Sequence, residues 1–217
     1  MNQQKFTFNL FQETTRVLSR DGRSAVVVDP GFASPDETAE FFNALGGLEV
    51  AAVLITHGHY DHTAGAKAVR DRFGCPVYMS AKDAPVLVYN VKLCGKLGIP
   101  VPDFGFERTD VADGDTIEAA GFRFKAISTP GHTPGGTCYL CEEEGFILTG
   151  DTLFAGTIGR TDLMYGEYDD IIVSVMDRLM ILDAGLRVLP GHGPETTIGR
   201  ERLTNPFLEP WGEKEED

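Results

Sequence analysis

Three of the chain's five histidines lie within one short segment. Residues 56–66 read THGHYDHTAGA, which places His57, His59, Asp61 and His62 within six positions. Imidazole nitrogens and carboxylate oxygens are ligands of zinc and related cations. Because residues two apart in an extended backbone point to the same side, His57 and His59 can reach one metal ion. Asp61 and His62 fall at the start of the next predicted helix, where they can reach a second position nearby.

The other two histidines also follow predicted strands. His132 stands in STPGHTPGG after the strand 122–128, and His192 stands in VLPGHGP after the strand 187–190. Asp151 repeats the pattern in FILTGDTLF, where it follows an apolar strand. Glycine and proline form tight turns at these exits, which leaves the side chains free to converge. The sequence therefore predicts one site built from several strand ends.

Strand and helix patterns run along most of the chain. Asp21-Gly22 predicts a hairpin, and Ser34, Pro35 and Gly46 predict the start and the end of a helix. The predicted strands cover 5–10, 15–20, 24–30, 50–56, 75–80, 115–129, 137–150 and 187–192, and the predicted helices cover 34–47, 63–74 and 169–182. The run 50–56 is apolar throughout, which favours a strand covered on both faces.

The order of these elements favours a layered α/β domain in which sheet packs on sheet and helices lie outside. We expect residues 1–217 to form a single domain whose acidic tail, 211–217, is disordered. Residues 81–102 are expected to be helical but interrupted at Pro85 and at Gly98-Ile99-Pro100, and we interpret this segment as a cover or lid over the site.

Composition narrows the class of protein. The chain has 217 residues, a formal net charge of −14 and a sequence pI near 4.7. Binding to nucleic acid or to an anionic membrane needs a basic face, so neither is expected. Neither a signal-type segment nor an apolar run of 18 residues is evident, and we expect a cytoplasmic protein. Cys138 and Cys141 form a lone CxxC, which we interpret as part of a buried strand rather than a zinc ribbon.

Taken together, these segments resemble the metallo-β-lactamase superfamily. The matching stretches are VVVDPG, THGHYDH, STPGHTPGG, LTGDTLF and LPGHGP, in the order of that family. The resemblance implies a four-layer αββα sandwich with two divalent metal ions at one edge, zinc being favoured and iron or manganese being alternatives. It implies that His57, His59 and His132 hold one ion, that Asp61, His62 and His192 hold the other, and that Asp151 bridges them. Asp29, in VVVDPG, would be a supporting residue.

The run GDTLFAGTIGRTDL is similar to glyoxalase II-like thioesterases and to persulfide dioxygenases. It places Arg160 where glyoxalase II-like enzymes have a basic residue that contacts the substrate. β-Lactamases of the commonest zinc class carry arginine at the position of His62, so this class is not expected. The helical extension with which full-length glyoxalase II binds glutathione has no counterpart after His192. The sequence therefore does not predict which thiol forms the substrate thioester.

The expected activity is hydrolysis of a small-molecule thioester, such as the glutathione conjugate S-lactoylglutathione. A water ionised by the metal pair would attack the carbonyl carbon while Asp61 orients this nucleophile. A thiolate leaves readily because the pKa of its thiol is about 8.5, so no strong general acid is needed. The alternative is a mononuclear iron persulfide dioxygenase that uses His57, His132 and Asp151. A lactonase, another ester or amide hydrolase of this superfamily and a non-catalytic metal-binding protein are less favoured, and the sequence does not indicate the oligomeric state.

Overall fold

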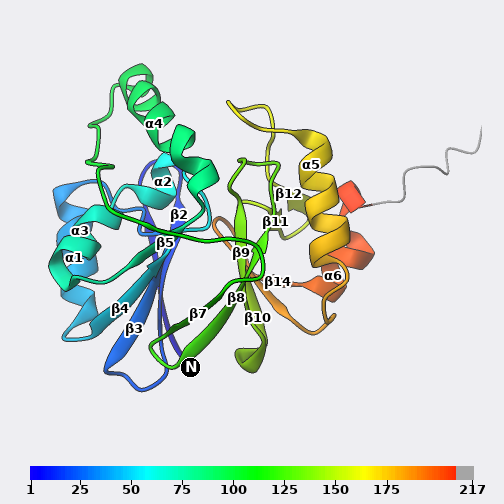
Figure 1. Ribbon diagram of the computed structural model, residues 1–217, viewed down its shortest axis with the longest axis horizontal. Coiled ribbons are helices and arrows are strands. Elements are labelled where there is room, and N and C mark those ends of the chain that lie inside the picture. Colours follow the sequence, from blue (N-terminus) through cyan, green and yellow to red (C-terminus); the bar gives the residue numbers. More distant parts are fainter. Residues whose placement is uncertain (209–217) are drawn as a thin grey trace, which may run out of the picture.

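The computed structural model describes residues 1–208, and the predicted acidic tail, 211–217, lies outside the described residues. Two six-stranded sheets pack face to face, and helices cover the outer face of each (Figure 1). The predicted four-layer αββα sandwich is confirmed by this arrangement.

The first sheet is built from the N-terminal part of the chain in the order β1-β2-β3-β4-β5-β6. Its first three strands pair antiparallel, whereas β3, β4, β5 and β6 pair parallel. The strands are β1 (Asn2–Phe8), β2 (Glu13–Ser19), β3 (Ser24–Val28), β4 (Glu49–Leu54), β5 (Val77–Met79) and β6 (Thr109–Asp110). As expected for the apolar run, β4 lies inside the sheet with both of its faces covered.

The second sheet follows in the order β14-β13-β10-β9-β8-β7. All of its pairs are antiparallel except β10 with β13. The strands are β7 (Thr116–Ala119), β8 (Phe122–Ser128), β9 (Thr137–Cys141), β10 (Phe146–Gly150), β13 (Arg187–Pro190) and β14 (Thr196–Thr197), and a separate hairpin is formed by β11 (Leu153–Phe154) and β12 (Thr157–Ile158).

The helices lie outside the sheets and near the strand ends. The helices α1 to α4 lie on the side of the first sheet, and α5 and α6 lie on the side of the second sheet (Figure 1). They are α1 (Pro35–Leu45), α2 (Tyr60–Thr63), α3 (Ala66–Phe73), α4 (Ala84–Leu97), α5 (Tyr168–Val173) and α6 (Ile198–Thr204). The chain also forms the 3₁₀ helices η1 (Ala81–Asp83), η2 (Glu142–Glu144) and η4 (Pro206–Leu208) and the π-helix η3 (Ser174–Leu179).

Three apolar cores separate the four layers. Phe41 of α1 packs with Val27 and Val53 on the outer face of the first sheet. Val26 and Leu54, which point the other way, meet the inner face of the second sheet. Side chains of α5, η3 and α6 pack on the outer face of the second sheet. The alternation of neighbouring valines between two cores follows from the period of two along a strand.

Local signals in the sequence account for the ends of α1. The Ser34 side chain accepts a hydrogen bond from the Glu37 backbone N–H, and the Glu37 carboxylate accepts one from the Ser34 N–H, which forms a capping box. Gly46 ends the helix in the left-handed conformation at φ 65°. The Ser34 start, the Gly46 end and the hairpin at Asp21-Gly22 are confirmed.

Two helices differ from the expectation. Pro85 does not interrupt 81–102, because it lies in the first turn of α4, where its missing N–H has no intrahelical partner to lose. The helix predicted over 169–182 changes from α5 to the π-helix η3. In this π-helix the Met180 N–H donates to the Val175 carbonyl, and the wider turn brings Met180 to the buried face while Met176 is exposed.

The CxxC pair behaves as interpreted from the sequence. All four cysteines are buried and none forms a disulfide. Cys138 packs in the outer core of the second sheet and Cys141 packs between the sheets, so the two thiols point to opposite faces of β9. Among residues 1–208, no helix has both the length and the apolar character needed to cross a bilayer.

Candidate metal centre

The first group of donor atoms joins the ends of both sheets. His57 and His59 follow β4, whereas His132 follows β8 on the opposite sheet. His57 Nε2 lies 3.0 Å from His59 Nδ1, which lies 2.9 Å from His132 Nε2. The three imidazoles are between 2 and 7% exposed, so they are almost fully shielded from solvent.

Neighbouring groups determine which ring nitrogens of the histidines carry protons. The Thr56 hydroxyl donates to Asp29 Oδ2 at 2.7 Å and therefore accepts from His57 Nδ1 at 3.1 Å. His132 Nδ1 donates to the Arg160 carbonyl oxygen at 2.7 Å. Because each Nδ1 donates outward, the Nε2 atoms of His57 and His132 face the cluster.

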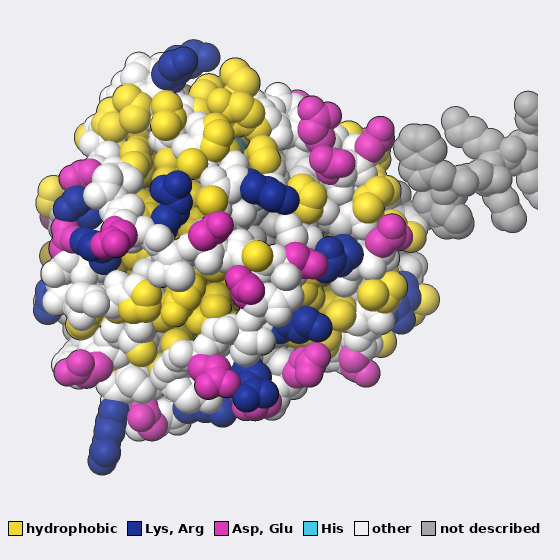
Figure 2. Space-filling view, in the orientation of Figure 1, with side chains coloured by type: hydrophobic (Ala, Val, Ile, Leu, Met, Phe, Trp, Pro, Cys, Tyr) yellow, Lys and Arg dark blue, Asp and Glu magenta, His cyan; other side chains and the backbone are white. Residues whose placement is uncertain are grey.

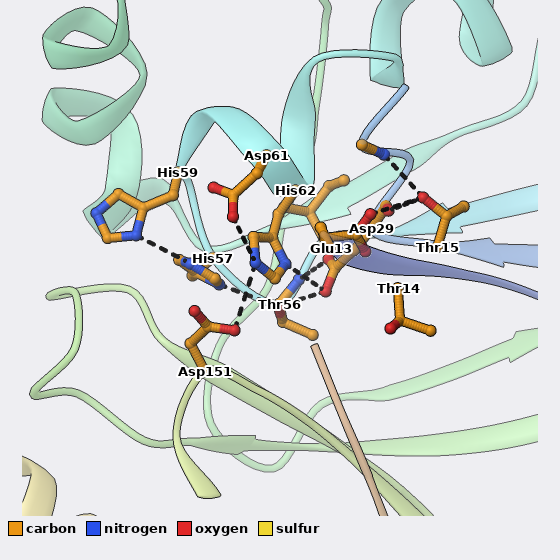
Figure 3. A network of polar contacts seen from close by, with 12 residues as sticks. Glu13, Thr14, Thr15, Asp29, Thr56, His57, His59, Asp61, His62 and Asp151 are labelled. Atoms are coloured by element: carbon orange, nitrogen blue, oxygen red, sulfur yellow. Dashed lines mark hydrogen bonds and ion pairs between the residues drawn. The ribbon is translucent and has the colours of Figure 1, made fainter. Parts of the chain in front are cut away.

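A second group of donors lies beside the first. Asp61 and His62 are on α2, and His192 follows β13 of the second sheet. His192 Nε2 lies 3.2 Å from Asp61 Oδ2 and 3.3 Å from His62 Nε2. His62 Nδ1 pairs with Asp29 Oδ2 at 3.0 Å, so Asp29 orients this ring from behind (Figure 3).

Asp151, at the end of β10, lies between the two groups. Its Oδ2 is 3.5 Å from both His132 Nε2 and His192 Nε2, and its Oδ1 is 3.4 Å from His62 Nε2. Gly191 packs against this carboxylate, because a Cβ there would lie 2.6 Å from Asp151 Oδ1. The close approach requires glycine at this position of the loop.

Burial and charge affect the two groups of donors differently. Burial, aided by the neighbouring imidazoles, lowers the pKa of His57 well below its usual value and lowers the pKa of His59 to about 3. Burial also disfavours the charged form of His62, but attraction to Asp151, Asp61 and Asp29 outweighs it and raises its pKa. For Asp151, the same attraction overcomes burial and lowers the pKa. Burial thus favours the neutral form of His57 and His59, beside a carboxylate that stays ionised.

These atoms suit divalent cations. Four sets of ligand atoms each lie within 4.8 Å of one another: His57, His59 and His132; Asp61, His62 and His192; His57, His62 and Asp151; and Glu13, Asp29 and His62. Among the described residues, Asp151 Oδ1 is buried without a hydrogen-bond partner. An unsatisfied carboxylate oxygen is costly to bury, and a cation held by this oxygen and the neighbouring imidazole nitrogens would satisfy it.

The sequence profile of the Metallo-beta-lactamase superfamily matches residues 14–192, which include every one of these donors. The chain belongs to the metallo-beta-lactamase superfamily. The Haemophilus influenzae protein named hydroxyacylglutathione hydrolase GloC is 32% identical to this superfamily member over 214 residues, covering 96% of this chain and 98% of the relative.

Two solved structures of high similarity extend over nearly the whole chain. The B3 metallo-beta-lactamase BLEG-1 superposes with a TM-score of 0.84 at 32% identity, covering 96% of this chain and all of BLEG-1. TTHA1623, in a di-iron-bound form, superposes with a TM-score of 0.83 at 31% identity, covering 94% of this chain and all of TTHA1623. The metallo-beta-lactamase fold is thereby shown.

Arg160 lies at the rim of the centre of this superfamily member. Its carbonyl accepts the bond from His132, but its guanidinium pairs with both carboxylate oxygens of Asp162 at 2.7 Å. The two side chains are 62 and 68% exposed. The residue predicted to contact substrate therefore contributes its backbone to the cluster and points its charge at a neighbouring acid.

Sequence reasoning missed Asp83, which connects two of the ligand loops. Its Oδ2 accepts from the Gly58 N–H at 2.7 Å and from the Thr133 hydroxyl at 2.8 Å, and its Oδ1 accepts from the Gly135 N–H at 2.5 Å. Asn90 of α4 donates to the Gly58 carbonyl at 2.8 Å. Residues 81–102 thus hold the backbone between His57 and His59, and a single aspartate without a motif gave no signal for this role.

Arg16, which lies in the predicted strand 15–20, was also missed as a support of the centre. This side chain on β2 is 2% exposed and donates to the Pro190 carbonyl at 2.7 Å. The Thr14 N–H donates to the Gly191 carbonyl at 2.8 Å. Two residues of the first sheet therefore hold the loop that carries His192, and only the three-dimensional structure brings these segments together.

Proposed function

We propose that this chain is a dinuclear metal-dependent hydrolase of thioesters, for which S-lactoylglutathione is a suitable test substrate. The superfamily and the relatives point to a metallo-hydrolase, and the name of the GloC relative supports the thioester. The observation that carries the proposal is the pair of three-residue ligand sets, with Asp151 within 3.5 Å of both.

In this proposal His57, His59 and His132 hold one cation, Asp61, His62 and His192 hold the second, and Asp151 contacts both. When bound, the cations would ionise a water at neutral pH and polarise the thioester carbonyl. Zinc fits the nitrogen and oxygen donors. Iron is the alternative, because the similar structure of TTHA1623 is in a di-iron-bound form.

The chain's own residues contribute orientation and charge. Attraction to His62 and the hydrogen bond from His192 outweigh burial and lower the pKa of Asp61. Its carboxylate is therefore ionised, and Oδ2 can accept a hydrogen bond. Asp29 and the Arg160 carbonyl hold the outward Nδ1 atoms of His62 and His132, which directs the Nε2 atoms of both rings at the cluster. The departing thiolate is stable near neutral pH and does not need to be protonated as it leaves. This agrees with a site in which every histidine is already assigned to a ligand set and none is left to act as a general acid.

The test combines metal analysis with activity. Protein purified without chelators is expected to contain two equivalents of metal and to hydrolyse S-lactoylglutathione. A chromogenic β-lactam and a glutathione persulfide with oxygen uptake are measured in parallel. One equivalent of iron with oxygen uptake would establish the dioxygenase instead, and β-lactam turnover without thioester hydrolysis would place the chain with BLEG-1.

Variants connect the result to the residues. His59→Ala and Asp151→Asn should each lose bound metal and hydrolysis together. Asp177→Asn is the matched control, because Asp177 is exposed on η3. Wild-type hydrolysis by His59→Ala would show that the first ligand set is wrongly assigned.

A further inference from the structure

A cavity of about 410 Å³ opens beside the ligand cluster. Its lining includes His132, Asp151 and His192 of the ligand cluster and the apolar side chains of Phe154, Ile158 and Pro194. His132 belongs to one ligand set and His192 to the other. A substrate group bound in this cavity would therefore lie next to a reacting carbon positioned between the two sets. Its size is within the range of small-molecule sites.

The apolar wall of the cavity is firmly supported. Phe154 belongs to the β11–β12 hairpin, and its ring lies 6.3 Å from the ring of His192. Behind the hairpin, the buried Glu201 of α6 accepts from the Gly156 N–H at 2.7 Å, and Asn205 donates to the Thr157 carbonyl at 3.2 Å. The wall is therefore held by two buried polar side chains and does not depend on surface loops.

Away from the ligand cluster, the lining of the cavity offers little to a negatively charged group. Apart from its two histidines, Arg160 is the one basic residue that lines it, and both oxygens of Asp162 neutralise that guanidinium at 2.7 Å. The chain as a whole carries a net charge of −14. A substrate carboxylate placed here would meet an apolar wall and no uncompensated lysine or arginine.

The surroundings of the centre are also apolar. Val88 and Val91 of α4 and Leu163 and Met164 of the loop that continues from Arg160 are exposed. Figure 2 shows hydrophobic side chains gathered along the upper edge of the molecule, where α4 and the loop before α5 lie in Figure 1.

We propose that this cavity, the acyl pocket, binds the uncharged, apolar acyl group of a thioester. The proposal rests on the thioesterase function above and narrows it: the chain prefers straight-chain acyl thioesters to those whose acyl group carries a charge. Phe154 is the residue that determines this preference, because it is the largest apolar side chain that lines the cavity.

The first experiment varies the acyl group on one neutral thiol. Acetyl, butyryl, hexanoyl and succinyl thioesters of N-acetylcysteamine are hydrolysed by the metal-loaded protein. We expect kcat/KM to rise by up to about fourfold for each added methylene, the value for full burial of one such group, and butyryl to exceed succinyl. Phe154→Ala should reduce the preference for hexanoyl over acetyl by about tenfold. Ile181→Ala is the control, because this side chain is 74% exposed and does not line the cavity.

The second experiment measures binding without turnover. Hexanoate, acetate and succinate are titrated into the metal-loaded protein by calorimetry, with hexanoate expected to bind most tightly and Phe154→Ala expected to remove its advantage. Equal binding of the three acids, or a preference for succinate, would overturn the acyl pocket even if thioesters are hydrolysed. Absence of hydrolysis with a retained preference for hexanoate would refute the proposed reaction and leave the pocket supported.

Discussion

Replacing Asp83 with alanine should destabilise the protein strongly, although Asp83 belongs to neither ligand set. The substitution removes three hydrogen bonds and leaves the Gly58 and Gly135 N–H groups buried without an acceptor. A hydrogen bond to a charged group contributes about 1.5–3 kcal/mol. Burial raises the pKa of Asp83, which shows that desolvation of its carboxylate offsets part of this gain. We therefore expect a loss of about 3–5 kcal/mol in the free energy of unfolding.

The assay is urea unfolding of the metal-loaded protein, complemented by thermal unfolding. For a chain of this size, the expected loss corresponds to a decrease in Tm of about 6–20 °C. Thr133→Val removes one of the three bonds and should cost about 1–2 kcal/mol, with clear coupling to Asp83→Ala in a double-mutant cycle. Lys82→Ala, at an exposed neighbouring position, should change stability by less than about 0.5 kcal/mol. A loss below about 1 kcal/mol for Asp83→Ala, or additivity with Thr133→Val, would refute the reasoning.

Three further changes test the support of the metal centre. Asp29→Asn should weaken metal binding by about 10- to 100-fold, because it disturbs the partners that orient the ligands; unchanged affinity in a metal titration would contradict this role. Arg16→Met should weaken one metal equivalent selectively, since Arg16 holds the loop of His192, and an equal loss at both equivalents would argue against it. Gly191→Ala should lower metal content and Tm together, because its Cβ would approach Asp151 Oδ1 to 2.6 Å, and a variant with wild-type metal content would show that the loop can shift.

The sequence predicted the donors of the centre more fully than their supports. The histidines could be found because they are rare, follow strands and stand among glycine and proline, and the structure places them in one cluster. Asp83 could not be found in this way. Its three partners lie 25 to 52 positions away in the sequence and meet it only through tertiary packing.

The fold shows the same division between local and long-range information. The capping box at Ser34 and the left-handed Gly46 depend on neighbours in sequence, so the limits of α1 were predictable. The change to a π-helix in η3 shifts the buried positions to include Met180, which a regular helical period over 169–182 does not anticipate. The pairing of Arg16 with Pro190 spans 174 positions and connects the two sheets.

Each of the two proposed ligand sets takes members from the ends of both sheets, with His57 and His59 meeting His132, and Asp61 and His62 meeting His192. Neither half of the chain alone supplies all three donors of either of these two sets. A cation held by either set would therefore connect the N-terminal half of the chain to the C-terminal half.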